Sequence, residues 1–202
     1  MLILMRHGAT ASNRATPPRL QGSGVDLPLS DAGRLEAEQA SGSLRHLDIG
    51  AVFCSTMRRA VETATIVAAP WNLSPASIDG LHEIDVGDWE GKSWSEIRES
   101  DPERFADYDR HGGAAAYPGG ESPEQVVDRA LPVLEDIARS HDDRPLIVAH
   151  RAVNRSVIGH LMGVPPERWR HVPQDNTGIN VLRWNGSRLK VETVNSTFHL
   201  IR

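Results

Sequence analysis

The chain has 202 residues, of which 39% are hydrophobic and 24% charged, and its formal net charge at pH 7 is −5. This length suits one sizeable core, so we expect residues 1–202 to form a single domain. The acidic balance argues against nucleic acid and anionic membranes as general partners, although a local basic pocket remains compatible with it.

The cysteine content and the apolar runs bear on location. The chain has one cysteine, Cys54, which cannot form an internal disulfide and therefore suits a reducing compartment. The apolar run at residues 1–5 is too short for a signal peptide or a membrane span, and no later run approaches the required length. We therefore expect a cytoplasmic protein with no membrane partner.

The first predicted element is a buried strand over residues 2–5, which stops abruptly at Arg6, His7 and Gly8. Open α/β sheets bind ligands at the carboxyl ends of their strands, so His7 would lie in such a crevice. Taken alone, the pattern is equally compatible with a strand and a polar turn whose histidine only bonds to the backbone.

A polar segment and a helix follow. Residues 9–24 are rich in Thr, Ser, Asn, Pro and Gly and predict a loop, in which Asn13, Gln21 and Gly22 are suited to line a site. Ser30 is then placed to cap a helix whose apolar residues recur at helical spacing.

The middle of the chain predicts a second strand and several helices. Residues 51–54 form a short apolar run, followed by a helix that begins near Arg58 and Arg59 and ends at Pro70. An acidic, glycine-punctuated block comes next. Short helices are expected near residues 93–99 and 102–110, and a loop over residues 112–120.

The last third of the chain contains the clearest signals. Ser122, Pro123 and Gln125 have the spacing of a capped helix start. Residues 145–149 predict a buried strand that ends at His150 and is followed by another helix.

The chain closes with two apolar runs, residues 179–184 and 189–194, which flank Asn185-Gly186 and predict a hairpin. Strands that alternate with helices indicate an α/β fold around a mainly parallel sheet.

Three of the predicted strands end in cationic side chains. Because the carboxyl ends of parallel strands share one edge of the sheet, these side chains can converge. By Coulomb's law, the repulsion between cations packed together at low dielectric costs on the order of several kcal/mol unless an anion is bound. The pattern therefore favours a dianionic ligand. Phosphate fits, since guanidinium groups match its oxygens. The residues concerned are Arg6, His7, Arg58, Arg59, His150 and Arg151.

The sequence contains neither a G-x-x-x-x-G-K-[ST] phosphate loop nor a G-x-G-x-x-G fingerprint, and no pair of histidines is spaced to share a metal. We therefore expect no cofactor and no metal ligands. Phosphate chemistry then requires a nucleophile from a side chain, and histidine can fill that role.

The motifs of the whole chain, in order, resemble those of the histidine phosphatase superfamily, the phosphoglycerate mutase-like proteins. The resemblance implies a three-layer α/β/α sandwich around the mainly parallel sheet. Its motifs are R-H-G-A-T at residues 6–10, Asn13 with residues 19–22, residues 26–30 with Gly33, residues 55–60 with Thr63-Ala64, residues 81–83 and 87–91, residues 119–122, His150, and residues 195–200.

By this resemblance His7 is the nucleophile that becomes a phosphohistidine. Arg6, Arg59 and His150 would hold the phosphoryl oxygens, and Glu83 would donate a proton to the leaving group. Asp85 and Glu90 are rival candidates for the proton donor. Asn13, Gln21 and Gly22 are expected to bind substrate.

Arg151 departs from the family, since many members have glycine directly after this histidine. We expect its side chain either to point away or to add charge to the pocket, where it could favour a substrate with a second anionic group. Arg58 is expected to be solvated, and Arg155 to brace the site or form an ion pair. The place of His199, in the tail packing or the pocket, stays open.

Three functions follow from these motifs. The first is a metal-independent phosphomonoesterase acting on a small phosphorylated metabolite. The second is a phosphoglycerate mutase, and the third is a phosphate-binding module without turnover. The short segment between Glu83 and Glu121 favours hydrolysis over the mutase reaction. The motifs identify neither the substrate nor whether the protein is a monomer or a homodimer.

Overall fold

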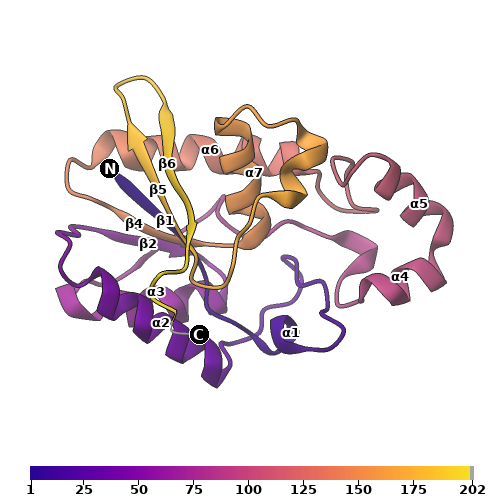
Figure 1. Ribbon diagram of the computed structural model, residues 1–202, viewed down its shortest axis with the longest axis horizontal. Coiled ribbons are helices and arrows are strands. Elements are labelled where there is room, and N and C mark those ends of the chain that lie inside the picture. Colours follow the sequence, from indigo (N-terminus) through magenta and orange to yellow (C-terminus); the bar gives the residue numbers. More distant parts are fainter. Residues whose placement is uncertain (201–202) are drawn as a thin grey trace.

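The computed structural model describes residues 1–200, in which six strands form one sheet in the order β3-β2-β4-β1-β5-β6 (Figure 1). The pairs β3/β2, β2/β4 and β4/β1 are parallel, whereas β5 runs antiparallel to β1 and β6. The predicted mainly parallel sheet is thus confirmed. The strands are β1 (Leu2–Arg6), β2 (Val52–Ser55), β3 (Ala76–Ile78), β4 (Leu146–Ala149), β5 (Ile179–Trp184) and β6 (Leu189–Ser196).

Helices cover both faces of the sheet (Figure 1). One face carries α2 and α3, the other carries α6 and α7, and α4 and α5 lie beyond one end of the strands. The predicted three-layer sandwich is confirmed. The helices are α1 (Ala11–Arg14), α2 (Asp31–Leu44), α3 (Arg58–Ala68), α4 (Trp94–Ser100), α5 (Pro102–Arg110), α6 (Pro123–Ser140) and α7 (Arg151–Leu161), with 3₁₀ turns at Ala69–Trp71, Gly87–Trp89 and Pro166–His171.

The apolar run of β1 is explained by its central place in the sheet. Successive side chains point to opposite faces of a strand. Leu2 and Leu4 therefore pack in the core beneath α6 and α7, while Ile3 and Met5 pack in the core beneath α2 and α3. A strand buried on both sides has no polar face, which is why its sequence reads as an unbroken apolar run.

The predicted helix starts are present with their capping bonds. Ser30 Oγ accepts from the Gly33 backbone N–H at 3.1 Å at the start of α2. At the start of α6, Ser122 Oγ accepts from the Gln125 N–H at 3.2 Å and the Gln125 side chain accepts from the Ser122 N–H at 2.7 Å. These local bonds set where the helices that border the site begin.

Two elements were not predicted. The expected loop over residues 9–24 contains one helical turn, α1, at whose start the Asn13 side chain accepts from the Thr10 N–H at 3.1 Å. The edge strand β3 has no buried residue, so its sequence lacks the apolar signal of the inner strands. Within residues 1–200, no helix is long and apolar enough to cross a membrane.

Candidate active site

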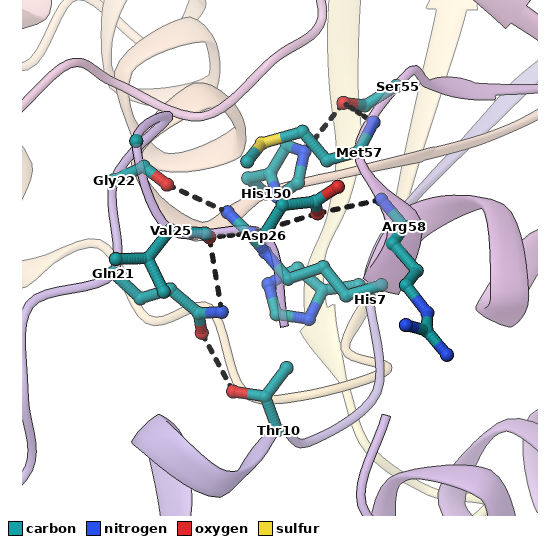
Figure 2. Close-up of polar contacts among 12 residues, drawn as sticks. His7, Thr10, Gln21, Gly22, Val25, Asp26, Ser55, Met57, Arg58 and His150 are labelled. Atoms are coloured by element: carbon teal, nitrogen blue, oxygen red, sulfur yellow. Dashed lines mark hydrogen bonds and ion pairs between the residues drawn. The ribbon is translucent and has the colours of Figure 1, made fainter. Parts of the chain in front are cut away.

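Basic side chains from three separate stretches meet at the carboxyl ends of β1, β2 and β4. His7 follows β1, Arg59 lies in the first turn of α3 after β2, and His150 follows β4. The ring centroids of His7 and His150 are 5.1 Å apart (Figure 2). All three side chains are buried, as is Arg6 at the end of β1. The structure therefore brings together the four groups that the sequence predicts around phosphate.

The two buried arginines are fixed by backbone carbonyls. Arg6 Nη1 donates to the carbonyl of Gln174 at 2.8 Å, and Arg59 donates from Nη1 to Val25 O at 2.9 Å and from Nη2 to Gly22 O at 3.2 Å. Carbonyls orient a guanidinium without neutralising its charge, although Asp26 Oδ1 also lies 3.8 Å from Arg59 Nη1. The Nε atoms of both arginines are buried without a partner, which leaves donors available for an anion.

The surroundings of Arg6 show how concentrated this positive charge is. Burial, followed by the nearby charge of Arg151, lowers the pKa of Arg6 to about 10. Opposing contributions from Glu83 and Asp175 do not offset these effects. A bound dianion would relieve the repulsion, so the site favours anionic ligands.

His7 is held in one tautomer. The Nδ1–H donates to the carbonyl of Gly8 at 2.7 Å, because a carbonyl can only accept. Burial, then the charges of Arg6 and Arg59, hold the pKa of His7 well below its usual value, so the ring is neutral near pH 7. A neutral ring protonated at Nδ1 has its lone pair on Nε2, which is the arrangement a nucleophile needs.

Gly8 explains why the chain is so closely packed behind His7. Its N–H donates to Thr63 Oγ1 at 3.0 Å. A Cβ on Gly8 would lie 2.4 Å from the carbonyl oxygen of Gly33, in the first turn of α2. Only glycine allows this approach, so α2 and α3 both press against the segment that presents His7.

His150 makes its hydrogen bond to the end of β2. Its Nε2 lies 2.8 Å from Ser55 Oγ, and its Nδ1 is buried without a partner (Figure 2). Burial and the charge of Arg59, with smaller effects from His7 and Arg6, lower the pKa of His150 well below its usual value. Ser55 had been recognised only as part of a motif, and its contact with His150 could not be seen in the sequence.

Among the three candidate proton donors, Glu83 is the one that lines the cavity beside His7. Its buried carboxylate accepts from the N–H of Ile84 at 2.9 Å and, through both oxygens, from the N–H of Ala152 at 3.2 Å. Asp85 accepts instead from Gly87, and Glu90 accepts from the backbone of the loop at residues 22–24. Asp85 and Glu90 therefore stabilise the backbone of loops through hydrogen bonds.

The segment of Glu83 is fixed from behind by Arg129 of α6, a residue that sequence reasoning missed. Arg129 donates to the carbonyls of Gly80 at 2.7 Å and Glu83 at 3.3 Å, and to both carboxylate oxygens of Glu121 at 2.8 and 3.0 Å. Glu121 in turn accepts from the Asp85 N–H at 2.9 Å. A regular helix pattern gives no sign that one of its arginines braces a distant loop.

A cavity of about 640 Å³ opens at Arg6, His7 and Glu83, whereas the buried Arg59 and His150 are not among its lining residues. Its lining combines the buried site with aromatic side chains of α4, α5 and the loop after them, and with arginines of α7. The lining side chains used below are Arg6, His7, Asn13, Gln21, Glu83, Trp94, Phe105, Tyr108, Tyr117, Arg151, Arg155 and Arg170.

The predicted substrate-binding residues divide into two groups. Asn13, Gln21 and Arg151 line the cavity. Gly22 does not; it is buried, and its backbone contacts Arg59 and Glu90. Gly22 therefore helps to orient the buried Arg59.

Three further expectations concern side chains around the site. Arg58 is exposed and pairs with Glu62 at 2.8 Å, as predicted. His199 is buried in the tail, with Nε2 2.9 Å from Thr177 Oγ1, and is absent from the cavity lining. Of the two roles expected for Arg155, bracing the site or forming an ion pair, the second is not found. Arg155 lines the cavity, and neither it nor Arg151 has a carboxylate within ion-pair distance in residues 1–200.

The sheet order, with a neutral histidine, a second histidine and two arginines at its carboxyl edge, defines a phosphate-handling α/β protein. Comparison with known proteins makes this specific. Residues 2–197 match the histidine phosphatase superfamily (branch 1), and the chain belongs to that family. It is accordingly a phosphatase.

Individual relatives agree. Phosphoserine phosphatase 1 of Hydrogenobacter thermophilus is 30% identical, over 98% of this chain and 93% of its own length. Glucosyl-3-phosphoglycerate phosphatase of Mycolicibacterium vanbaalenii is 32% identical, over 83% of this chain and 76% of its own. Among solved structures, Bacillus stearothermophilus YhfR superposes with a TM-score of 0.84 at 32% identity and covers 94% of each chain.

Proposed function

We propose that the chain hydrolyses phosphate monoesters through a phosphohistidine on His7, with Glu83 as the proton donor. The observation that carries this proposal is the hydrogen bond from His7 Nδ1–H to the Gly8 carbonyl. This bond leaves the lone pair of His7 on Nε2, beside the buried cations Arg6 and Arg59. The family assignment supports hydrolysis, and the positions of His7 and Glu83 beside one cavity support these two roles.

In the first step, Nε2 of His7 attacks phosphorus as the bond from phosphorus to the leaving oxygen breaks. The departing oxygen takes the proton of the Glu83 carboxyl group, which must be protonated for this step. In the second step, a water attacks phosphorus and the nitrogen–phosphorus bond breaks. The water's proton returns to Glu83, so inorganic phosphate leaves and the site is restored.

Fixed positive charge supplies most of the stabilisation. Phosphoryl transfer spreads negative charge over the three equatorial oxygens, and preorganised donors lower the energy of that state. Arg6 and Arg59 have unpartnered Nε donors here, and His150 has an unpartnered Nδ1. Because side chains supply this charge, activity should persist in excess chelator.

The substrate should carry a second anionic group. Arg151 and Arg155 stand one turn apart on α7, both line the cavity, and burial together with the charge of Arg155 lowers the pKa of Arg151. Two neighbouring cations with no carboxylate of residues 1–200 within ion-pair distance favour an anion between them. Phosphoserine and glucosyl-3-phosphoglycerate, named for two relatives, each combine a phosphate ester with a carboxylate.

The intermediate is tested by mixing enzyme with a ³²P-labelled phosphomonoester and quenching in alkaline denaturant, in which nitrogen–phosphorus bonds survive. Label should be bound to the wild type and absent from His7→Ala. No label with any of a panel of hydrolysed substrates would contradict the proposal.

With 3-phosphoglycerate, release of inorganic phosphate supports a phosphatase, whereas 2-phosphoglycerate as the main product supports a mutase.

The second anionic group is tested with phenyl phosphate and 4-carboxyphenyl phosphate, which differ by one carboxylate. The ratio of kcat/KM, carboxylated over plain, should fall about tenfold in Arg151→Gln and in Arg155→Gln, as expected for one lost charged hydrogen bond. Arg170→Gln is the control, because Arg170 lines the same cavity but is paired with Asp109 at 3.1 Å. An equal loss on both substrates would contradict the assignment.

A further inference from the structure

Ser55 lies where it can decide which nitrogen of His150 bears the proton. Its side chain is fully buried at the end of β2. Ser55 Oγ accepts from the Met57 N–H at 3.2 Å and lies 2.8 Å from His150 Nε2 (Figure 2). These are the two hydrogen-bond partners of this hydroxyl within residues 1–200.

The bond to Met57 uses one lone pair of the Ser55 oxygen, because a backbone N–H can only donate. The hydroxyl proton then needs an acceptor, and Nε2 of His150 is the acceptor in reach. If Nε2 donated instead, the hydroxyl proton would be buried without a partner, which costs about 1–3 kcal/mol.

The opposite side of the ring completes the argument. Nδ1 of His150 is buried and has no hydrogen-bond partner, and the ring faces His7 at a centroid distance of 5.1 Å. A neutral ring that accepts at Nε2 must be protonated at Nδ1. The proton on Nδ1 is then a buried donor that has no partner in residues 1–200, so a phosphoryl oxygen bound beside His7 could accept it.

We infer that Ser55 is a positioning residue that holds His150 in the Nδ1–H tautomer, so that this imidazole donates a hydrogen bond to the phosphoryl group without being charged. The inference rests on the proposed role of His150, but the tautomer is a property of the resting enzyme. The low pKa of His150 is consistent with a neutral ring. Ser55 acts through His150 and does not touch the substrate.

The direct test is the histidine side-chain ¹⁵N spectrum of the wild-type enzyme near pH 7, with His150 assigned by its loss in His150→Ala. Nδ1 should give the signal of a protonated ring nitrogen and Nε2 that of an unprotonated one. The reverse pattern, or a doubly protonated ring, would overturn the inference. This measurement needs no turnover, so it is independent of whether His7 forms a phosphohistidine.

The functional test is a double-mutant cycle. Ser55→Ala should lower kcat/KM about tenfold in the wild type but less than about twofold in His150→Ala, because coupled residues are not additive. Ser55→Thr, which keeps the hydroxyl, should recover most of the activity. Equal losses in both backgrounds would show that Ser55 does not act through His150.

A matched control exists on α7. Ser156 is also fully buried and its hydroxyl has no partner, so Ser156→Ala removes the same atoms without touching His150. It should leave both the His150 tautomer and kcat/KM unchanged. If Ser156→Ala lowers activity as much as Ser55→Ala, the effect belongs to core packing and the inference fails.

Discussion

Glu83, Asp85 and Glu90 show how neighbouring carboxylates acquire different roles from their partners. Asp85 and Glu90 accept hydrogen bonds from loop N–H groups outside the cavity, whereas Glu83 lines the cavity at the start of α7. The family resemblance indicated Glu83 as the proton donor, with Asp85 and Glu90 as rivals. The loop bonds that separate the three carboxylates have no signal in the sequence, because they depend on how the loops fold.

Glu83→Gln tests the assignment through the leaving group. With an alkyl phosphate, whose alkoxide must be protonated, kcat should fall about 10²- to 10⁴-fold, the usual contribution of general acid catalysis. With p-nitrophenyl phosphate, whose leaving group is stable as an anion, the loss should be much smaller. Asp85→Asn should show no such dependence on leaving group, and the reverse result would move the role to Asp85.

At the scale of elements, the segment of Glu83 depends on α6. The half-buried Arg129 joins α6 to the carbonyls of Gly80 and Glu83 and to Glu121. The sequence predicted this helix and its cap from local spacing. The brace escaped prediction because it joins residues 46 and 49 positions apart along the chain.

Arg129→Lys keeps the charge but cannot reproduce this fork of donors. The free energy of unfolding should fall by about 1–3 kcal/mol, as for buried acceptors left unpaired, and kcat should fall with it. Urea denaturation and steady-state kinetics measure the two effects. The control is Arg139→Lys on the same helix, whose ion pair with Asp136 is exposed, and it should be nearly silent.

At the scale of the whole molecule, the strands and most helices were predictable because apolar periodicity and capping residues are local signals. Their convergence at one sheet edge followed from topology. The side chains that line the cavity could not be predicted from the sequence. Trp94, Tyr108 and Tyr117 come from segments whose positions depend on tertiary packing.

The two buried histidines of the site make the stability of the folded protein depend on pH. The pKa values of His7 and His150 are lowered in the folded protein, so the unfolded chain binds protons first as pH falls below about 6.5. The free energy of unfolding should therefore decrease below that pH, by up to about 1.4 kcal/mol per pH unit for each histidine. The free energy of unfolding should reach its full value above about pH 6.5.

Urea unfolding between pH 5 and pH 8 measures this slope. His7→Gln should reduce the slope by about one histidine's share. Replacement of the exposed His46 by Gln is the control and should leave the slope as it is. An unchanged slope in His7→Gln would show that this ring does not resist protonation when folded.

The aromatic wall of the cavity has a practical consequence. Trp94 lines the cavity, is 38% exposed and stacks on Tyr108 at a centroid distance of 5.8 Å, whereas Trp89 is fully buried. A ligand that enters beside Trp94 removes water from its indole ring. Trp94 is thus a built-in fluorescent reporter of cavity occupancy. Its emission should shift on titration with inorganic phosphate, and the shift should vanish in Trp94→Phe.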